Sequence, residues 1–253
     1  MAERITSRAN PLCAHFRKLA SSRAYRQEAG EFLCDSPKLL REACLWGAPV
    51  RTVLHTPGVP LPDLDGADVR EVSESVMAAV SPMETPQGVV FTCAMTPPPL
   101  PTCLEPGRYL VLDGIQDPGN TGTILRTADA FDCRAVFLLP GCADLYSPKT
   151  LRSAMGAHFR SAQWSCTLED AAALFRAAGV PLYAAALGPD TADVRRVDLT
   201  SAALVIGSEG RGVSPQALAA CQGTVQIPMS GRCESLNAAV AAAVLLWEGW
   251  RQT

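Results

Sequence analysis

The chain has 253 residues, with 22 lysines and arginines against 25 aspartates and glutamates, so its formal net charge is −3. Charged residues make up 19% and apolar residues 48%, which excludes a disordered protein and favours one large or two modest globular domains. No apolar run is long enough for a transmembrane helix, and Arg4 and Arg8 precede any apolar stretch, which argues against a secretory signal. We therefore expect a cytoplasmic location. The slight overall acidity argues against a nucleic-acid-binding protein when the chain is taken as a whole.

The N-terminal segment has the opposite charge. Six basic residues and no acidic residue lie between Arg4 and Arg26, and residues 1–51 carry a net charge of +4. Residues 52–96 carry −5, and the rest of the chain carries −2. A basic segment inside an acidic protein is typical of local contact with phosphate groups, although a solvated helix face over residues 11–29 explains it as well.

Two elements are predicted in this N-terminal part. Ser36 and Pro37 open a helix at Lys38–Trp46, because proline suits the first turn of a helix. Val50–His55, in which three of six residues are β-branched, predicts a short strand.

A proline-rich segment divides the chain. Residues 97–107, with the sequence PPPLPTCLEPG, contain five prolines and a glycine, so they can form neither a helix nor a central strand. We interpret them as a linker between domains at residues 1–96 and 108–253.

Strands and helices alternate after the linker. Strands are predicted at Tyr109–Asp113, Arg134–Leu139, Leu182–Ala186, Ala203–Ile206 and Val225–Ile227. Helices are predicted at Asn120–Phe131, Pro148–Gly156, Glu169–Ala178 and Ser235–Trp250. This order predicts an α/β domain with a mainly parallel sheet.

Cysteine and histidine give no sign of a metal site. The ten cysteines contain no CxxC pair, and the three histidines are scattered in the sequence. We expect unpaired structural thiols and no bound metal.

Three loops rich in glycine, asparagine and serine follow predicted strands. They are Asp113–Arg126, Leu204–Pro215 and Ile227–Asn237. In α/β sheets, ligands bind beyond the carboxyl ends of the strands, so these loops are the candidate site. None contains GxGxxG or GxxxxGK[ST], which disfavours a nucleotide-cofactor oxidoreductase and a P-loop protein.

In this order, the three loops resemble the three motifs of the SpoU/TrmH family of RNA ribose 2′-O-methyltransferases. The first is similar to N-x-G-x-x-x-R (Asn120, Gly122, Arg126), the second to G-S-E-G-x-G (Gly207–Gly212), and the third to I-P-M…S-L-N (Ile227–Asn237). Ser147–Gly156 is also similar to the family. Residues 1–96 resemble, more loosely, the small α/β, ribosomal-protein-like RNA substrate-binding domain of many members.

The resemblance implies a trefoil-knotted α/β domain at residues 108–253 that binds S-adenosylmethionine and works as a homodimer without a metal. Family members hold the cofactor mainly through backbone groups of the second and third motifs. Carried over to this chain, the implied cofactor-binding residues are Gly207, Ile227, Met229 and Leu236.

The resemblance also implies catalytic roles. It assigns activation of the ribose hydroxyl to Arg126, but a guanidinium with a pKa of about 12–14 is a poor base. We therefore expect Arg126 to clamp a phosphate and stabilise the developing alkoxide. Asn120 is expected to orient the ribose or its loop, and Glu209 to fix the glycine-rich loop or place Arg126. Ser235 and Asn237 are expected to hydrogen-bond around the reacting ribose.

Four of the five catalytic candidates also have a structural interpretation, which for Glu209 is an ordinary turn carboxylate. Arg126 can pair with Asp129 one turn later, and Asn120 and Ser235 can be helix N-caps. Asn237 falls in the first turn of the last predicted helix without an evident capping role, and asparagine is a poor helix former, which favours a functional role.

Two further expectations concern the helices. The stripe Leu236, Val240 and Val244 is expected in the core, and the many alanines beside it favour close packing, including at a dimer interface. Asp132 stands where a glycine commonly ends the first-motif helix of the family, so we expect an uncomfortable helix end there.

The expected substrate is structured RNA, and ribosomal RNA of the 23S type is favoured over transfer RNA because of the N-terminal domain. The other interpretation is a non-catalytic RNA-binding relative of the same fold. The residues expected to contact RNA are Arg8, Arg17, Lys18, Arg23, Lys149 and Arg152, although these can also be ordinary surface charges.

Overall fold

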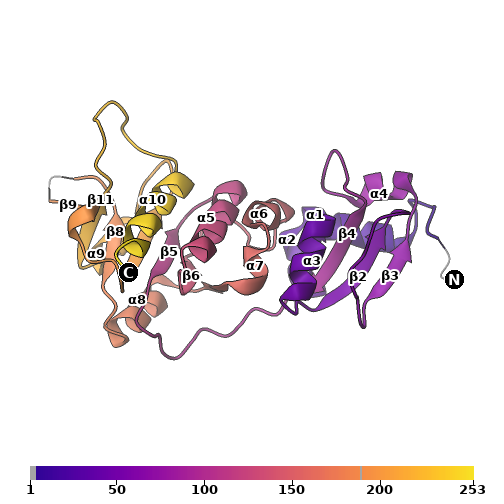
Figure 1. The fold of residues 1–253 in the computed structure, drawn as a ribbon, viewed down its shortest axis with the longest axis horizontal. Helices are drawn as coiled ribbons and strands as arrows, with labels where there is room; N and C mark the ends of the chain where they lie inside the picture. The colour runs from indigo at the N-terminus through magenta and orange to yellow at the C-terminus, as the bar shows by residue number, and fades with distance from the viewer. Residues whose placement is uncertain (1–3, 189) are drawn as a thin grey trace. The chain divides into compact units, whose positions relative to one another are not determined.

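The structure, a computed structural model, describes residues 4–188 and 190–253 and divides into two compact units (Figure 1). The first unit runs to Pro97 and also includes Asp144–Arg160. The second unit consists of Pro98–Ala143 and Ser161–Thr253. No helix of the described residues is long and apolar enough to span a membrane.

The first unit is built on a four-stranded sheet with the order β1-β4-β2-β3. Its strands are β1 (Glu31–Asp35), β2 (Val50–His55), β3 (Asp68–Glu71) and β4 (Val89–Ala94). The central strand β4 runs antiparallel to both β1 and β2, whereas β3 is parallel to β2. Strand β2 has the predicted bounds.

Helices cover both faces of this sheet. They are α1 (Pro11–Ser21), α2 (Arg23–Ala29), α3 (Pro37–Leu45), α4 (Glu74–Val80), α6 (Pro148–Ala154) and α7 (Ala157–Arg160). Along β4, Val90 packs with Phe16 of α1 and Met77 of α4, whereas Phe91 packs with Leu40 of α3. Successive side chains of a strand point to opposite faces, so every residue of β4 is buried. Helix α3 begins one residue before the predicted start.

Three ion pairs within the first unit link Asp144–Arg160 to residues before Pro97. The guanidinium of Arg26, only 5% exposed, lies 2.6 Å from the Asp144 carboxylate. Arg160 binds Glu42 at 2.6 Å. These partners are 118 residues apart in sequence, which explains why this packing is not evident from local patterns.

The third pair changes the interpretation of Arg152. Its Nη1 donates to Oδ2 of Asp35 at 2.8 Å, and the Asp35 carboxylate is buried. Burial raises the pKa of Asp35, against the stabilising effect of the Arg152 charge. Arg152, expected to contact RNA, therefore compensates a buried carboxylate within the first unit.

The second unit has a seven-stranded parallel sheet with the order β7-β6-β5-β10-β8-β11-β9. Its strands are β5 (Tyr109–Asp113), β6 (Ala135–Leu138), β7 (Ala162–Ser165), β8 (Leu182–Ala185), β9 (Ala192–Asp193), β10 (Ala203–Gly207) and β11 (Gly223–Gln226). The expected α/β class with a mainly parallel sheet is confirmed. The short edge strands β7 and β9 were not predicted.

The helices of this unit are α5 (Pro118–Ala130), α8 (Leu168–Ala177), α9 (Pro215–Ala220) and α10 (Ala238–Trp250), with a 3-10 turn η1 at Val194–Arg196. One core is formed by alternate strand residues such as Tyr109 and Phe137 with Phe175 of α8. Helix α10 packs against α5 and β10, so the end of the chain returns to its first motif (Figure 1).

Helix α10 differs from the sequence prediction in two respects. It begins at Ala238, three residues later than Ser235, because Asn237 caps it. The stripe Leu236, Val240 and Val244 was expected in the core, but these side chains are 36%, 49% and 37% exposed. That expectation is wrong because α10 buries its alanine-rich face instead, with Ala238 and Ala242 among its buried residues.

The end of α5 has the expected unfavourable backbone. Asp132 has a φ of 52°, in the left-handed region that favours glycine.

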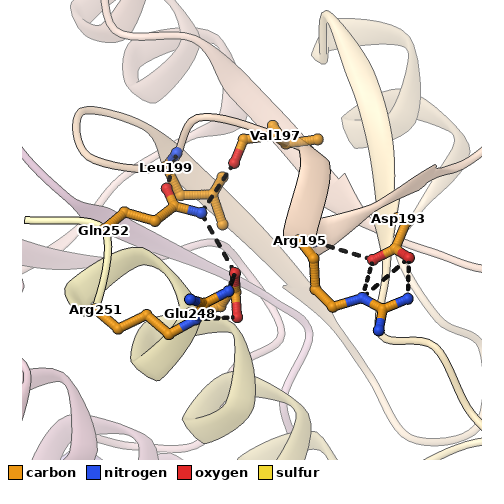
Figure 2. A network of polar contacts seen from close by, with 7 residues as sticks. All are labelled: Asp193, Arg195, Val197, Leu199, Glu248, Arg251 and Gln252. Atoms are coloured by element: carbon orange, nitrogen blue, oxygen red, sulfur yellow. Dashed lines mark hydrogen bonds and ion pairs between the residues drawn. The ribbon is translucent and has the colours of Figure 1, made fainter.

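A polar network fixes the end of α10 (Figure 2). The Gln252 side chain accepts a hydrogen bond from the Leu199 amide at 2.8 Å and donates to the Val197 carbonyl at 3.1 Å. Arg251 Nε donates to the buried Glu248 carboxylate at 2.7 Å and lowers the pKa of that group. The last turn of α10 is thereby held on the segment after η1.

Candidate functional site

The three sequence motifs begin at the carboxyl edge of the parallel sheet. Strands β5 and β10 are neighbours, with Asp113 in register with Gly207, and the first and second motifs follow these two strands. The third motif follows β11, which lies beyond β8 in the same sheet. Parallel strands bring their carboxyl ends to one edge, so loops far apart in sequence meet there.

One hydrogen-bonded chain joins the three motifs. Asn120 donates its Nδ2 to Oε1 of Glu209, and Asn237 donates its Nδ2 to Oδ1 of Asn120 at 3.2 Å. Asn120 thus uses both ends of its side-chain amide, one toward the second motif and one toward the third. The structure brings together three of the five expected catalytic residues.

The capping roles differ from those expected. Asp117, not Asn120, caps α5, and its Oδ1 accepts from the Asn120 amide at 2.8 Å. Asn237, not Ser235, caps α10, and its Oδ1 accepts from the amides of Ala239 and Val240 at 2.9 and 3.3 Å. The expectation that Asn237 has no capping role is wrong. Asn237 combines a cap through its oxygen with the Asn120 contact through its nitrogen.

Asp117 and Asp113 are the residues that sequence reasoning missed. Asp117 directly precedes Pro118, and a capping residue before a proline is a recognisable helix start. Asp113, at the end of β5, accepts a hydrogen bond from the Ser214 amide at 2.6 Å and so ties the second motif to the first. No local pattern identifies that second contact.

The second motif forms a tight loop, here called the glycine loop, Gly207–Val213. Ser208 and Gly212 exchange two backbone hydrogen bonds of 3.1 and 2.8 Å. A Cβ on Gly207 would lie 2.1 Å from backbone atoms of Gly212 and Val213, so no other residue fits there without moving the loop.

A cavity of about 420 Å³ lies beside the glycine loop. All four expected cofactor-binding residues line it: Gly207, Ile227, Met229 and Leu236. The expected catalytic residues Glu209 and Ser235 also line it. The remaining lining is largely apolar and comes from β8, β10, β11, α9 and α10, which is typical of a small-molecule site with few polar groups.

Arg126 lies on α5 and its side chain is exposed. It forms no ion pair or hydrogen bond with a side chain in the part of the chain that the structure describes. The structural interpretation paired it with Asp129, but Asp129 accepts a hydrogen bond from the Ser161 hydroxyl at 3.1 Å. Arg126 is therefore available to an external anion.

The residues expected to contact RNA lie in the first unit. Arg17 and Arg23 are exposed on α1 and α2, and Lys149 is exposed on α6. Lys18 lies over the Tyr25 ring, 5.1 Å from its centroid. Arg8 donates to the Ser75 carbonyl at 3.0 Å.

All ten cysteines are free thiols. Cys133 is buried, and burial raises the pKa of its thiol to about 12. Among the described residues, no three histidine, cysteine, aspartate or glutamate side chains are grouped as a metal site would require.

The chain matches the family model described as the SpoU rRNA Methylase family over residues 107–247, and the MRM3-like substrate binding domain over residues 10–90. It is 35% identical to the 23S rRNA (guanosine(2553)-2′-O)-methyltransferase RlmP of Bacillus subtilis, covering 97% of this chain and 98% of that protein. It is 33% identical to the 23S rRNA (uridine(2479)-2′-O)-methyltransferase of Streptomyces viridochromogenes, covering 99% and 93%. The structure matches an AdoMet-bound rRNA methyltransferase from Sinorhizobium meliloti with a TM-score of 0.89 at 30% identity, covering 99% and 98%. The chain therefore belongs to the SpoU rRNA methylase family.

Proposed function

We propose that this protein transfers a methyl group from S-adenosylmethionine to a ribose 2′-hydroxyl in ribosomal RNA of the 23S type. The observation that carries the proposal is the hydrogen-bonded chain of Glu209, Asn120 and Asn237, with Glu209 also bordering the cavity of the glycine loop. The two curated relatives, which match nearly the whole chain, carry names of 23S rRNA 2′-O-methyltransferases.

The cavity fits the cofactor. Its apolar lining suits an adenine ring, and the missing Cβ of Gly207 lets Gly212 and Val213 pack closely, which sets the shape of the glycine loop beside the cavity. Ile227, Met229 and Leu236 would hold the adenosine part together with Gly207. When bound, S-adenosylmethionine supplies an electrophilic methyl group on a sulfonium.

Arg126 would bind the RNA phosphate next to the reacting ribose and stabilise the developing alkoxide. A guanidinium remains protonated at neutral pH, so the hydroxyl proton would leave to that phosphate or to water. The polar chain through Asn120 would fix the start of α5, which carries Arg126 two turns later. Asn237 and Ser235 would hydrogen-bond around the ribose.

The N-terminal domain at residues 1–96 would bind the RNA substrate, and 97–107 would link it to the methyltransferase domain at 108–253. Exposed basic residues on α1 and α2 support this role. The bacterial 23S rRNA methyltransferases among its relatives also support a cytoplasmic location.

We further propose that the methyltransferase domain is trefoil-knotted and forms a homodimer through α10. Val240 and Val244 continue in Trp247 and Trp250, which are 48% and 42% exposed. The two indole rings stack on each other, and both contact Phe131 at the end of α5. Exposed apolar surface of this extent is typical of a protein interface.

Methyl transfer with labelled S-adenosylmethionine tests the function. Purified protein should label a 23S rRNA transcript, and nuclease digestion should recover the label in a 2′-O-methylated nucleotide. Selective labelling of transfer RNA would show instead a tRNA methyltransferase. Binding of RNA without any cofactor binding would show a non-catalytic relative.

Glycine substitutions test the cofactor site in the same preparation. Gly207→Ala should weaken S-adenosylmethionine binding at least tenfold, because the new Cβ displaces the loop backbone. Gly210→Ala is the matched control, since a Cβ there has no atom within 4 Å and the backbone is not in the left-handed region. If Gly207→Ala and Gly210→Ala bound S-adenosylmethionine with equal affinity, the cofactor would not bind beside Gly207.

A further inference from the structure

Among the described residues that line the cavity beside the glycine loop, Arg211 is the one basic residue. The lining also has one acidic side chain, Glu209, and this carboxylate already accepts a hydrogen bond from Asn120. Arg211 is exposed, and its guanidinium has no ion-pair or hydrogen-bond partner within residues 4–188 and 190–253. Within the described part of the chain, this positive charge at the cavity therefore makes no contact with a negative group.

The fold of the glycine loop fixes where this charge lies. The two backbone hydrogen bonds between Ser208 and Gly212 make Glu209, Gly210 and Arg211 the tip of the loop. Glu209 reaches from the tip toward α5, where Asn120 holds it. At the base of the loop, the backbone of Gly212 and Val213 is closely packed against Gly207, which restricts movement of the tip. Of the two opposite charges on this short turn, Glu209 therefore has a partner within the described residues and Arg211 has none.

We propose that Arg211 binds the carboxylate of the methionine part of S-adenosylmethionine, an inference that rests on the proposed function. The carboxylate is the one negative group of this cofactor, and an apolar lining cannot compensate it. A guanidinium binds a carboxylate through two parallel N–H donors. An RNA phosphate would suit the same donors, but Arg211 shares its cavity with the residues proposed to hold the adenosine.

Isothermal titration with two ligands tests this assignment. Arg211→Gln should weaken binding of S-adenosylmethionine about tenfold, as expected for loss of a charge-assisted hydrogen bond. Binding of decarboxylated S-adenosylmethionine should change less than twofold, because that ligand lacks the group that Arg211 recognises. Its retained affinity also shows that the variant has kept its fold and its cavity. Arg211→Lys should recover part of the loss, since lysine keeps the charge without the planar fork.

Arg232→Gln is the matched control. Arg232 is exposed in the loop of the third motif and does not line the cavity, so its loss should leave the affinity for both ligands unchanged. Equal weakening of both ligands by Arg211→Gln would overturn the proposal and point to cavity shape. Unchanged cofactor affinity with weaker binding of a 23S rRNA transcript would overturn it in favour of a phosphate contact. If the wild-type protein bound neither ligand, the proposed function itself would fail, a result distinct from a defect of one variant.

Discussion

At the scale of single residues, the site depends on side chains that perform two tasks. Asn237 caps α10 with its oxygen and reaches Asn120 with its nitrogen. Glu209 borders the cavity and holds Asn120. Arg126, in contrast, is exposed and without a side-chain partner in the described ranges. An exposed residue without a side-chain partner, on the helix that also carries Asn120, is suited to bind a substrate and not to hold the fold.

Removal of the Arg126 guanidinium should separate chemistry from cofactor binding. Arg126→Ala should abolish detectable methyl transfer, because the developing alkoxide loses its stabilising charge. Cofactor affinity, measured by isothermal titration, should stay within a few-fold, since Arg126 does not line the cavity. Near-normal turnover of this variant would remove Arg126 from the mechanism.

The double role of Asn237 can be divided by two substitutions. Asn237→Ala should cost about 1 kcal/mol of folding stability through the lost cap, and methyl transfer should fall as well. Asn237→Asp keeps a capping oxygen but removes the amide donor to Asn120, so stability should be preserved while activity falls. Denaturant unfolding and methyl-transfer rates provide the two readouts. Full activity of Asn237→Asp would show that the Asn120 contact is dispensable.

At the scale of elements, α10 shows what the spacing of apolar residues can predict and what it cannot. Its period of apolar residues correctly indicates a helix, but periodicity cannot distinguish a face buried within one chain from a face buried between two. The alanine-rich face lies against the protein, whereas the larger Val240, Val244 and Trp247 are exposed. The start of α10 was misplaced because Ser235 and Asn237 are both good capping residues, and only the structure shows which is used.

The exposed stripe leads to a prediction about assembly. Val240→Glu combined with Val244→Glu should convert the proposed dimer to a monomer, because burial of two carboxylates in an apolar interface is costly. Light scattering after size-exclusion chromatography measures the mass. Leu45→Glu is the control, since Leu45 is 75% exposed and belongs to the first unit, whereas the stripe belongs to the second. A wild-type monomer, or a dimer in the double variant, would contradict the proposed interface.

At the scale of the whole chain, local signals predicted most elements of the second unit, few elements of the N-terminal part, and long-range contacts poorly. The strands β2 and β5 have their predicted bounds, and the three motifs meet as expected at one edge of the parallel sheet. The packing of Asp144–Arg160 into the first unit was missed because it depends on ion pairs between residues more than a hundred positions apart. The contact between Asn120 and Asn237 spans 117 positions; the motif resemblance assigned both residues to one site but did not predict this contact.

The distribution of charge along the chain leads to a prediction about RNA binding. Arg17→Glu together with Lys18→Glu should weaken binding of a 23S rRNA transcript strongly at low salt and less at high salt. Contacts of these two residues with phosphates would release counterions on binding, and this contribution to affinity is largest at low salt. Filter binding at several salt concentrations measures the effect. Arg152→Glu is no substitute for this test, since it would leave two carboxylates facing each other in the first unit. An effect that does not depend on salt would show that Arg17 and Lys18 face away from the RNA.

The central claim is methylation of one ribose in ribosomal RNA. It is tested most directly by mapping 2′-O-methylation across ribosomal and transfer RNA from cells with the protein, without it, and with Arg126→Ala. We predict that one site in 23S-type ribosomal RNA is methylated with the protein and unmethylated in the other two samples. Identical maps in all three samples, or a difference confined to transfer RNA, would contradict this account.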